Sequence, residues 1–318
     1  MIKNKRIFIT GGAGFLGSHL TGYLCKNNKI FIFDKDKNLI QNTNLLKEKN
    51  VTFIKGSVLN QRQVVKEMKK TKPDIVLHMA SMAHVENIYK SPWLNMEICL
   101  NGTRFVAGAS VANKVKKFIN FSTSEVYGPY AYGVSEDVTT KQGTNKDLRW
   151  TYSTGKVAGE HITQYYHQEH GLDTTIIRPF NITGTGLVSG VVFQMVRKAL
   201  NGQPMVVYDE GNQIRAYCHV EDFINALDKI ISNKKTKGQT YNIGNPRAVI
   251  SMAELAHKIN SLIPKKVPLE FIELKKEDVE VRVPSIQKIK KELKWEPKIN
   301  LNAILIEYFC FCVNAGSL

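Results

Sequence analysis

The sequence predicts an α/β protein, with a doubly wound parallel sheet followed by a smaller mixed α/β lobe toward the C-terminus. Two observations predict this. Short apolar runs alternate with stretches of helical spacing through the first 180 residues, which is typical of a parallel sheet covered on both faces. After Phe180 the alternation weakens, and glycine, proline and short mixed elements dominate. We therefore expect a sheet domain over 1–180, with a later contribution near 213–232, and a second lobe over 181–318.

The first half of the sheet shows the alternation clearly. "RIFIT" (6–10) is an apolar run, and "GFLGSHLTGYLCKNN" (14–28) follows it with helical spacing. "KIFIFD" (29–34) is the second strand, residues 39–50 show helical spacing again, and "VTFIKGS" (51–57) is the third strand. Each strand is separated from the next by a helix-length segment, as a parallel crossover requires.

The second half repeats the alternation three times. Each unit is a stretch of helical spacing followed by an apolar run. The three units are 64–70 with 74–81, 94–113 with 117–124, and 152–170 with 173–180. In the C-terminal lobe we expect helices over 193–200, 222–231 and 252–262.

Composition argues against several classes of protein. The formal charge is +16, but the lysines are spread along all 318 residues, so we expect no nucleic-acid binding. No apolar stretch approaches the roughly 20 residues that span a bilayer, and no secretion signal is evident, so we expect no membrane association. The five cysteines are scattered without a CxxC pair, which favours a reduced, cytoplasmic protein without a metal.

A glycine cluster, "TGGAGFLGSHL" (10–20), lies directly behind the first strand and opens the first helix. Gly11 permits the tight turn, Gly14 lets the backbone approach a pyrophosphate, and Gly17 lets the helix pack on the strand. The free N–H groups at the helix N-terminus attract phosphates. A carboxylate at Asp34, where the second strand ends, accepts hydrogen bonds from ribose hydroxyls and repels a 2′-phosphate. The pattern predicts a Rossmann-like domain that binds NAD.

A second motif, "TYSTGK", places Tyr152 and Lys156 four residues apart on one face of a predicted helix. A free tyrosine has a pKa of about 10 and is a poor base. A nearby ammonium and a positive nicotinamide ring stabilise the phenolate, so Tyr152 can take a hydroxyl proton while hydride leaves the same carbon. "FSTSEVYG" (121–128) lies at the strand end, where open α/β sheets bind ligands.

Together these motifs resemble the short-chain dehydrogenase/reductase family, specifically its extended branch of NAD-dependent nucleotide-sugar epimerases and dehydratases. The resemblance covers nearly the whole chain. It implies an enzyme that oxidises carbon 4 of a nucleotide-diphosphate hexose, a substrate-binding lobe over 181–318, and a homodimer through the helices at 97–112 and 152–170. By the same resemblance, the catalytic residues are Tyr152, Lys156, Thr123, Ser124 and Glu125.

The resemblance also implies the binding residues. The NAD contacts are expected at Gly11, Gly14, Phe15, Leu16, Gly17, Asp34, Ser57, Val58, Met79, Ala80, Ser81, Tyr152 and Lys156. The substrate contacts are expected at His84, Asn181, Arg215 and Arg282, the two arginines because guanidinium groups suit diphosphate oxygens.

The fate of the oxidised sugar stays open. "STSE" is similar to GDP-mannose 4,6-dehydratases and UDP-glucuronate decarboxylases, and Glu125 can take the proton from carbon 5. We expect a 4,6-dehydratase or an epimerase. The alternatives are a UDP-glucuronate decarboxylase-like enzyme, a C4 dehydrogenase that releases a 4-keto sugar, and a dinucleotide-binding regulatory protein. Four features depart from the family pattern: Ser57 and Ser124 replace aspartates, Cys99 replaces an asparagine, and Gly184-Thr185-Gly186 replaces the usual "GPR".

Overall fold

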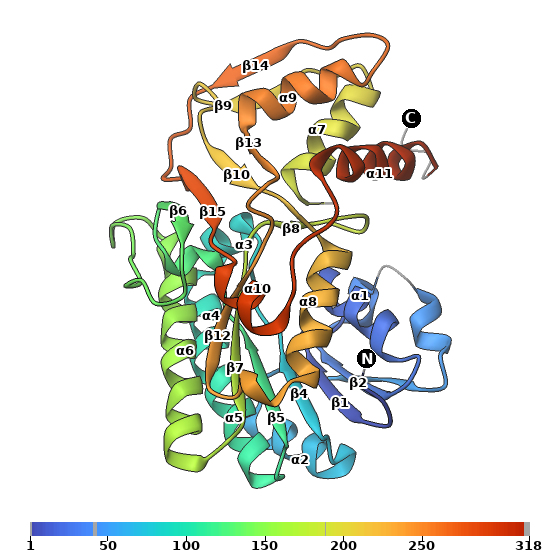
Figure 1. The fold of residues 1–318 in the computed structure, drawn as a ribbon, viewed down its shortest axis with the longest axis vertical. Helices are drawn as coiled ribbons and strands as arrows, with labels where there is room; N and C mark the ends of the chain where they lie inside the picture. The colour runs from blue at the N-terminus through green and yellow to red at the C-terminus, as the bar shows by residue number, and fades with distance from the viewer. Residues whose placement is uncertain (1, 41–42, 188, 315–318) are drawn as a thin grey trace.

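The molecule has two lobes, a larger one around a seven-stranded sheet and a smaller one at the opposite end (Figure 1). The structure is a computed structural model and describes residues 2–40, 43–187 and 189–314. In the described chain the expected α/β architecture is confirmed, with a parallel central sheet and helices on both of its faces.

The larger sheet contains seven parallel strands. They are β1 (Arg6–Thr10), β2 (Lys29–Asp34), β3 (Val51–Lys55), β4 (Ile75–His78), β5 (Lys117–Phe121), β7 (Thr174–Pro179) and β12 (Gln239–Ile243). Their order is β12-β7-β5-β4-β1-β2-β3. The strand order reverses at β1, which lies between β2 and β4, and ligands bind at such a switch point. The first six strands fall within the predicted runs; β12 was not predicted.

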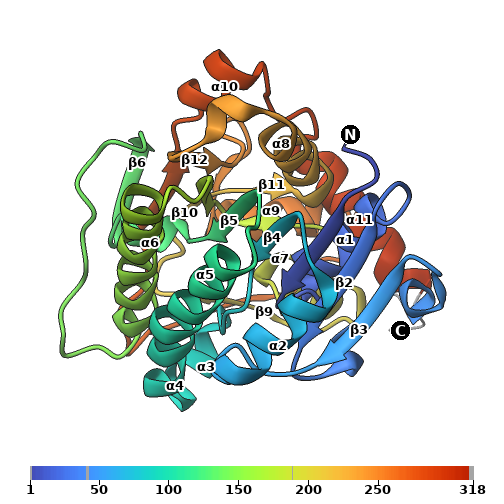
Figure 2. The same cartoon turned by 90° about the horizontal axis from the view of Figure 1, so that it is seen from below.

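Helices cover both faces of this sheet (Figure 2). One face carries α1 (Phe15–Leu24), α8 (Val220–Ser232) and α10 (Gln287–Leu293). The other carries α2 (Gln61–Thr71), α5 (Thr103–Ala112) and α6 (Trp150–His170). The short helices α3 (Val85–Lys90) and α4 (Pro92–Glu97) lie between α2 and α5 in the chain.

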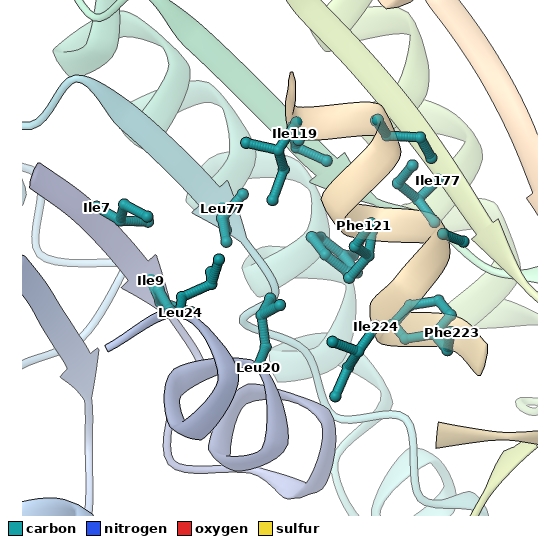
Figure 3. Close-up of a cluster of buried hydrophobic side chains, with 14 of the residues drawn as sticks. Ile7, Ile9, Leu20, Leu24, Leu77, Ile119, Phe121, Ile177, Phe223 and Ile224 are labelled. Carbon is teal, nitrogen blue, oxygen red and sulfur yellow. The ribbon is translucent and has the colours of Figure 1, made fainter. Parts of the chain in front are cut away.

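Alternating side chains of the strands explain this two-sided cover. Ile9 and Phe121 face the first set of helices, where they join Leu20 of α1 and Phe223 of α8 in one buried cluster (Figure 3). Phe8 belongs to the cluster on the opposite face. Each such side chain contributes roughly 1.5–3 kcal/mol when fully buried.

Two predicted helices differ from the structure. Over 39–50 the described residues form two short 3₁₀ turns, Lys37–Leu39 and Thr43–Lys47, and residues 41–42 lie outside the described chain. The first turn is set locally, because the Asp36 carboxylate accepts the N–H of Asn38. The predicted helix over 94–113 is interrupted by a π turn, Ile98–Gly102, between α4 and α5. Single π turns of this kind often occur at functional sites.

The smaller lobe is built mainly from the second half of the chain. Its four-stranded sheet has the order β13 (Val249–Ser251), β10 (Ile214–Ala216), β15 (Val281–Pro284) and β6 (Tyr130–Val134). A second pair joins β9 (Met205–Tyr208) to β14 (Leu269–Ile272), and β8 (Ile182–Thr183) pairs with β11 (Cys218–His219). Its helices are α7 (Val191–Leu200), α9 (Met252–Ser261) and α11 (Leu301–Asn314). The chain crosses between the two sheets several times, so a domain border at residue 180 stays a prediction.

Candidate active site

The glycine turn between β1 and α1 brings three backbone segments into close contact. Gly11 has a φ of +69°, and a Cβ there would lie 2.7 Å from the Cα of Ala80. A Cβ at Gly17 would lie 2.6 Å from the Cα of Gly12. Glycine is required at both positions because any side chain would displace neighbouring backbone. The turn therefore leaves the N-terminus of α1 open to a ligand.

A cavity of about 430 Å³ opens beside this turn. All thirteen residues expected to contact NAD line it: Gly11, Gly14, Phe15, Leu16, Gly17, Asp34, Ser57, Val58, Met79, Ala80, Ser81, Tyr152 and Lys156. Further lining residues that the sequence motifs did not indicate include Lys35, Ile98, Ser122, Pro179 and Leu187. The cavity runs from the end of β2 to the start of α6, the two ends that the sequence motifs predict.

Asp34 fits the ribose end of a dinucleotide. Its Oδ2 accepts the N–H of Ala13 at 3.0 Å, and its Oδ1 accepts the N–H of Lys35 at 2.7 Å. Burial raises the pKa of this carboxyl, while the two backbone N–H groups oppose the rise. Each carboxylate oxygen has a second lone pair for a ribose hydroxyl. The turn, the cavity and this carboxylate together fit NAD.

Tyr152 and Lys156 lie at the other end of the cavity. The Tyr152 side chain is buried, and burial raises its pKa, while the neighbouring Ser81 and Thr123 hydroxyls lower it. The Lys156 Nζ donates a hydrogen bond of 2.6 Å to the carbonyl of Phe121 and lies 5.8 Å from the centre of the Tyr152 ring. Burial lowers the pKa of Lys156. The glycine turn and the Tyr152 and Lys156 motif, which are far apart in the chain, thus line one cavity.

His78, at the end of β4, adds a buried network that the sequence motifs did not indicate. Its Nδ1 lies 2.8 Å from the Thr10 hydroxyl, and its Nε2 lies 3.1 Å from the Thr103 hydroxyl. Burial, reinforced by the charge of Lys156, lowers the pKa of His78 to about 3. The ring is therefore neutral at physiological pH. The Thr103 hydroxyl also donates to the carbonyl of Cys99 at 2.6 Å, in the π turn.

A charged cluster lies beside Ser124, and its members are not among the residues that line the cavity. Arg149 Nη2 lies 3.3 Å from a carboxylate oxygen of Glu125 and 3.3 Å from one of Asp278. Arg215 Nη2 lies 3.2 Å from the other oxygen of Asp278. Arg282 is buried and donates from Nη1 to the carbonyl of Ser124 at 2.7 Å. The sequence motifs indicated only three of the five charged groups, and missed Arg149 and Asp278.

Three atoms of this cluster have no hydrogen-bond partner among the described residues. They are Glu125 Oε2, Arg149 Nε and Arg282 Nη2, and all three are buried. Burial, with the charges of Arg215 and Arg149, lowers the pKa of Arg282 to about 10, and Glu125 opposes this. Buried polar atoms are normally paired, so a water molecule, an ion or a polar ligand would satisfy these three atoms.

The structure places the other predicted site residues in different surroundings. Ser124 is buried, and its carbonyl accepts a hydrogen bond from Arg282. Asn181 has a φ of +40° and donates from its amide to the carbonyl of Ala216. His84 precedes α3, and its carbonyl accepts the N–H groups of Asn87 and Ile88 in that helix. None of the four predicted substrate residues is among the residues that line the cavity.

Comparison with known proteins decides the family. Residues 7–244 match the NAD-dependent epimerase/dehydratase family. The chain belongs to this family. As a member of the NAD-dependent epimerase/dehydratase family, it shares the extended short-chain dehydrogenase/reductase scaffold that its motifs predict, and the expected NAD-dependent enzyme class is confirmed.

Named members of the family differ in their products. The chain is 35% identical over 268 residues to dTDP-D-glucose 4,6-dehydratase of Dictyostelium discoideum, covering 80% of this chain but only 61% of that relative's length. It is 31% identical to UDP-glucuronic acid decarboxylase 6 of Arabidopsis thaliana over 304 residues, covering 94% and 86% of the two chains. The crystal structure of PbgP3 protein from Burkholderia pseudomallei superposes with a TM-score of 0.85 at 28% identity, covering 99% of this chain and 98% of that one.

The described residues contain neither a membrane-spanning helix nor a cluster of metal ligands. No helix in residues 2–40, 43–187 and 189–314 is long and apolar enough to cross a bilayer. Within the same residues, no group of three or more His, Cys, Asp or Glu side chains lies together where it could hold a metal ion.

Proposed function

We propose that this member of the family oxidises carbon 4 of a nucleotide-diphosphate sugar with NAD. The observation that supports the proposal is the meeting of Tyr152, Lys156 and Thr123 at the end of the cavity that the glycine turn opens. NAD, when bound, supplies the hydride acceptor and a positive charge near Tyr152.

Each of the three residues then has a separate part in proton transfer. The Tyr152 hydroxyl takes the proton of the sugar hydroxyl, because a cationic neighbour stabilises its phenolate form. The Thr123 hydroxyl, which lowers the pKa of Tyr152 and lines the same cavity, orients the reacting hydroxyl. The Lys156 ammonium, fixed on the carbonyl of Phe121, provides positive charge beside the tyrosine ring.

Glu125 is the group that acts after oxidation. A keto group at carbon 4 acidifies the neighbouring C–H bond, and a carboxylate placed there can abstract its proton. One oxygen of Glu125 faces Arg149, while the other has no partner among the described residues. Proton abstraction at carbon 5, followed by loss of the carbon 6 hydroxyl as water, is the step of a 4,6-dehydratase, whereas epimerisation at carbon 4 needs no proton transfer at carbon 5. Glu125 therefore supports the dehydratase more than the epimerase.

The arginine cluster favours a second candidate, decarboxylation of a sugar acid. A uronate needs cationic donors for its carboxylate, and both Arg149 and Arg282 have a buried, unpartnered N–H group close to Glu125. After oxidation at carbon 4, the carboxylate of a uronic acid is a β-keto acid, which loses carbon dioxide readily. These two donors beside Glu125 therefore support this alternative.

Product mass separates the candidates. Purified protein is incubated with UDP-, dTDP-, GDP- and CDP-linked hexoses and with UDP-glucuronate, and the product masses are measured by mass spectrometry. Loss of water indicates a dehydratase, and loss of carbon dioxide a decarboxylase. A product with unchanged mass and altered NMR couplings indicates an epimerase, and loss of two hydrogens a C4 dehydrogenase. No turnover of any sugar by protein that holds NAD would contradict the proposal and favour a regulatory protein.

We also propose that the enzyme is a cytoplasmic homodimer. On α4, the π turn and α6, large apolar side chains are exposed, namely Trp93, Leu94, Leu100 and Tyr165. Patches of this kind often mark protein–protein contacts. The cytoplasmic location is supported separately by the five cysteines, which are free thiols and so suit a reducing compartment.

Light scattering tests the dimer: the wild type is expected at twice the chain mass, and Trp93→Glu at a lower mass. A wild-type monomer would contradict it.

A further inference from the structure

The segment that leads into β15 is anchored against the larger lobe by several contacts. The Lys276 ammonium lies 3.9 Å from the centre of the Tyr89 ring. The backbone N–H of Glu277 donates to Asp147 at 3.1 Å, and its carboxylate accepts the indole N–H of Trp150. Tyr89 itself donates to Asp147 at 2.7 Å. The next residue along the chain is thereby held in one position between the lobes.

That residue, Asp278, joins two arginines that come from different lobes. One of its oxygens lies 3.2 Å from Arg215, on β10, and the other lies 3.3 Å from Arg149, at the start of α6. Arg149 continues to Glu125 at 3.3 Å. Four alternating charges thus connect the predicted diphosphate residue to the predicted base. The Asp278 side chain is only 29% exposed and that of Arg149 only 8%, so solvent screens these contacts weakly.

We propose that Asp278 is a positioning residue that orients Arg215 and Arg149 toward the anionic part of the substrate; this rests on the proposed function. A free arginine loses rotamer freedom when it binds a ligand, and this loss weakens binding. A fixed carboxylate that already holds the arginine in place reduces the entropy lost on binding. The charge of Asp278 alone predicts the opposite effect on affinity for an anionic substrate. Asp278 reduces the positive charge of the cluster and so weakens its attraction for an anion. The two accounts therefore predict opposite signs for one substitution.

Equilibrium binding of nucleoside diphosphates measures that sign. UDP, dTDP, GDP and CDP are titrated into the NAD-loaded wild type, Asp278→Asn and the matched control Glu280→Gln, which removes the same charge from an exposed position two residues away. The diphosphate that binds the wild type best is expected to bind Asp278→Asn about tenfold more weakly, as expected when a hydrogen bond to a charged group is lost. Glu280→Gln is expected to bind it within about twofold of the wild type, as an exposed charge contributes little.

Equal or tighter binding to Asp278→Asn would overturn the inference. If none of the four diphosphates binds the wild type, the proposed function itself fails, and the inference fails with it. Should Asp278→Asn not fold, Asp278→Glu makes the same test, since it keeps the charge but moves it by one methylene. Weaker binding then supports the positioning role, and unchanged binding contradicts it.

A second measurement asks whether Asp278 acts through Arg215. In an Arg215→Ala background, adding Asp278→Asn is expected to weaken diphosphate binding by less than it does in the wild type, because one of the two groups that it positions is already gone. A further tenfold loss would show a general structural role instead. With the turned-over sugar, KM is expected to rise more than kcat falls, because the positioned groups hold the non-reacting part of the substrate. A fall in kcat alone would contradict this.

Discussion

The two sides of the active site are built in different ways. On the cofactor side, tight backbone contacts at Gly11 and Gly17 and the buried pair Tyr152 and Lys156 come from two short, contiguous motifs. On the side where we propose that the sugar nucleotide binds, five charged side chains come from separated positions in the chain, and one of them, Asp278, contacts two of the arginines. Backbone contacts cannot adjust to a change, whereas a shared set of charges can redistribute. We therefore expect all-or-none effects on the cofactor side and graded effects on the substrate side.

The largest expected effect tests the cofactor side. Tyr152→Phe removes the hydroxyl that takes the proton and keeps the buried ring, so the fold should survive. General acid–base groups contribute about 10²–10⁴-fold to rate, and we expect kcat to fall by about 10³-fold. Product formation under saturating sugar measures it. The matched control is Tyr165→Phe on the same helix, where the ring is exposed and the rate should not change. A Tyr152→Phe enzyme with near-normal turnover would remove the basis of the comparison.

The next effect is on stability and cofactor content. Gly11→Ala places a Cβ 2.7 Å from Ala80 at a φ of +69°, and a strained backbone of this kind costs about 1–3 kcal/mol. We expect a loss of about 2 kcal/mol in urea unfolding, and purified protein with little bound NAD. Gly22→Ala is the control on α1, where a Cβ would make only an ordinary contact, 3.4 Å from Leu45. That change should leave stability equal or higher, because alanine favours a helix. Equal stability of the two variants would show that the turn tolerates a side chain.

The same difference explains how much the sequence alone could predict. The strands and the cofactor side follow from local patterns, because each motif acts through neighbours in the chain or through a strand end whose place the sheet determines. Arg149 could have been found, since it lies three residues before Tyr152, near the same face of the helix. Asp278 carries no local signal, because its role exists only once β15 lies beside β10. The strand β12 was missed because nothing in its short polar-ended run distinguishes it from the irregular second half.

The smallest expected effect lies where the smaller lobe holds a loop beside the cavity. Glu307 on α11 contacts His219 at 2.6 Å and accepts the N–H of Thr185 at 3.0 Å, in the loop that leads to the cavity residue Leu187. The hydrogen bond to His219 lowers the pKa of Glu307 from 4.5 to about 2. A carboxyl with a lowered pKa stabilises the fold above its unfolded pKa. This contribution is present above pH 4.5 and is lost as the pH falls toward 2.

Glu307→Gln isolates that contribution, because glutamine keeps the shape but does not titrate. The Glu307 side chain is 34% exposed, so we expect it to contribute only about 1 kcal/mol at neutral pH. Urea unfolding of both proteins between about pH 7 and about pH 3 should show the difference shrinking in acid, while the exposed control Glu169→Gln shows no such trend. Turnover should fall only slightly, since the change shifts a loop and leaves the catalytic groups in place. A stability difference between the two proteins that stays constant with pH would mean that the carboxylate charge does not hold the loop. A complete loss of turnover would mean that this contact, like those on the cofactor side, has an all-or-none effect.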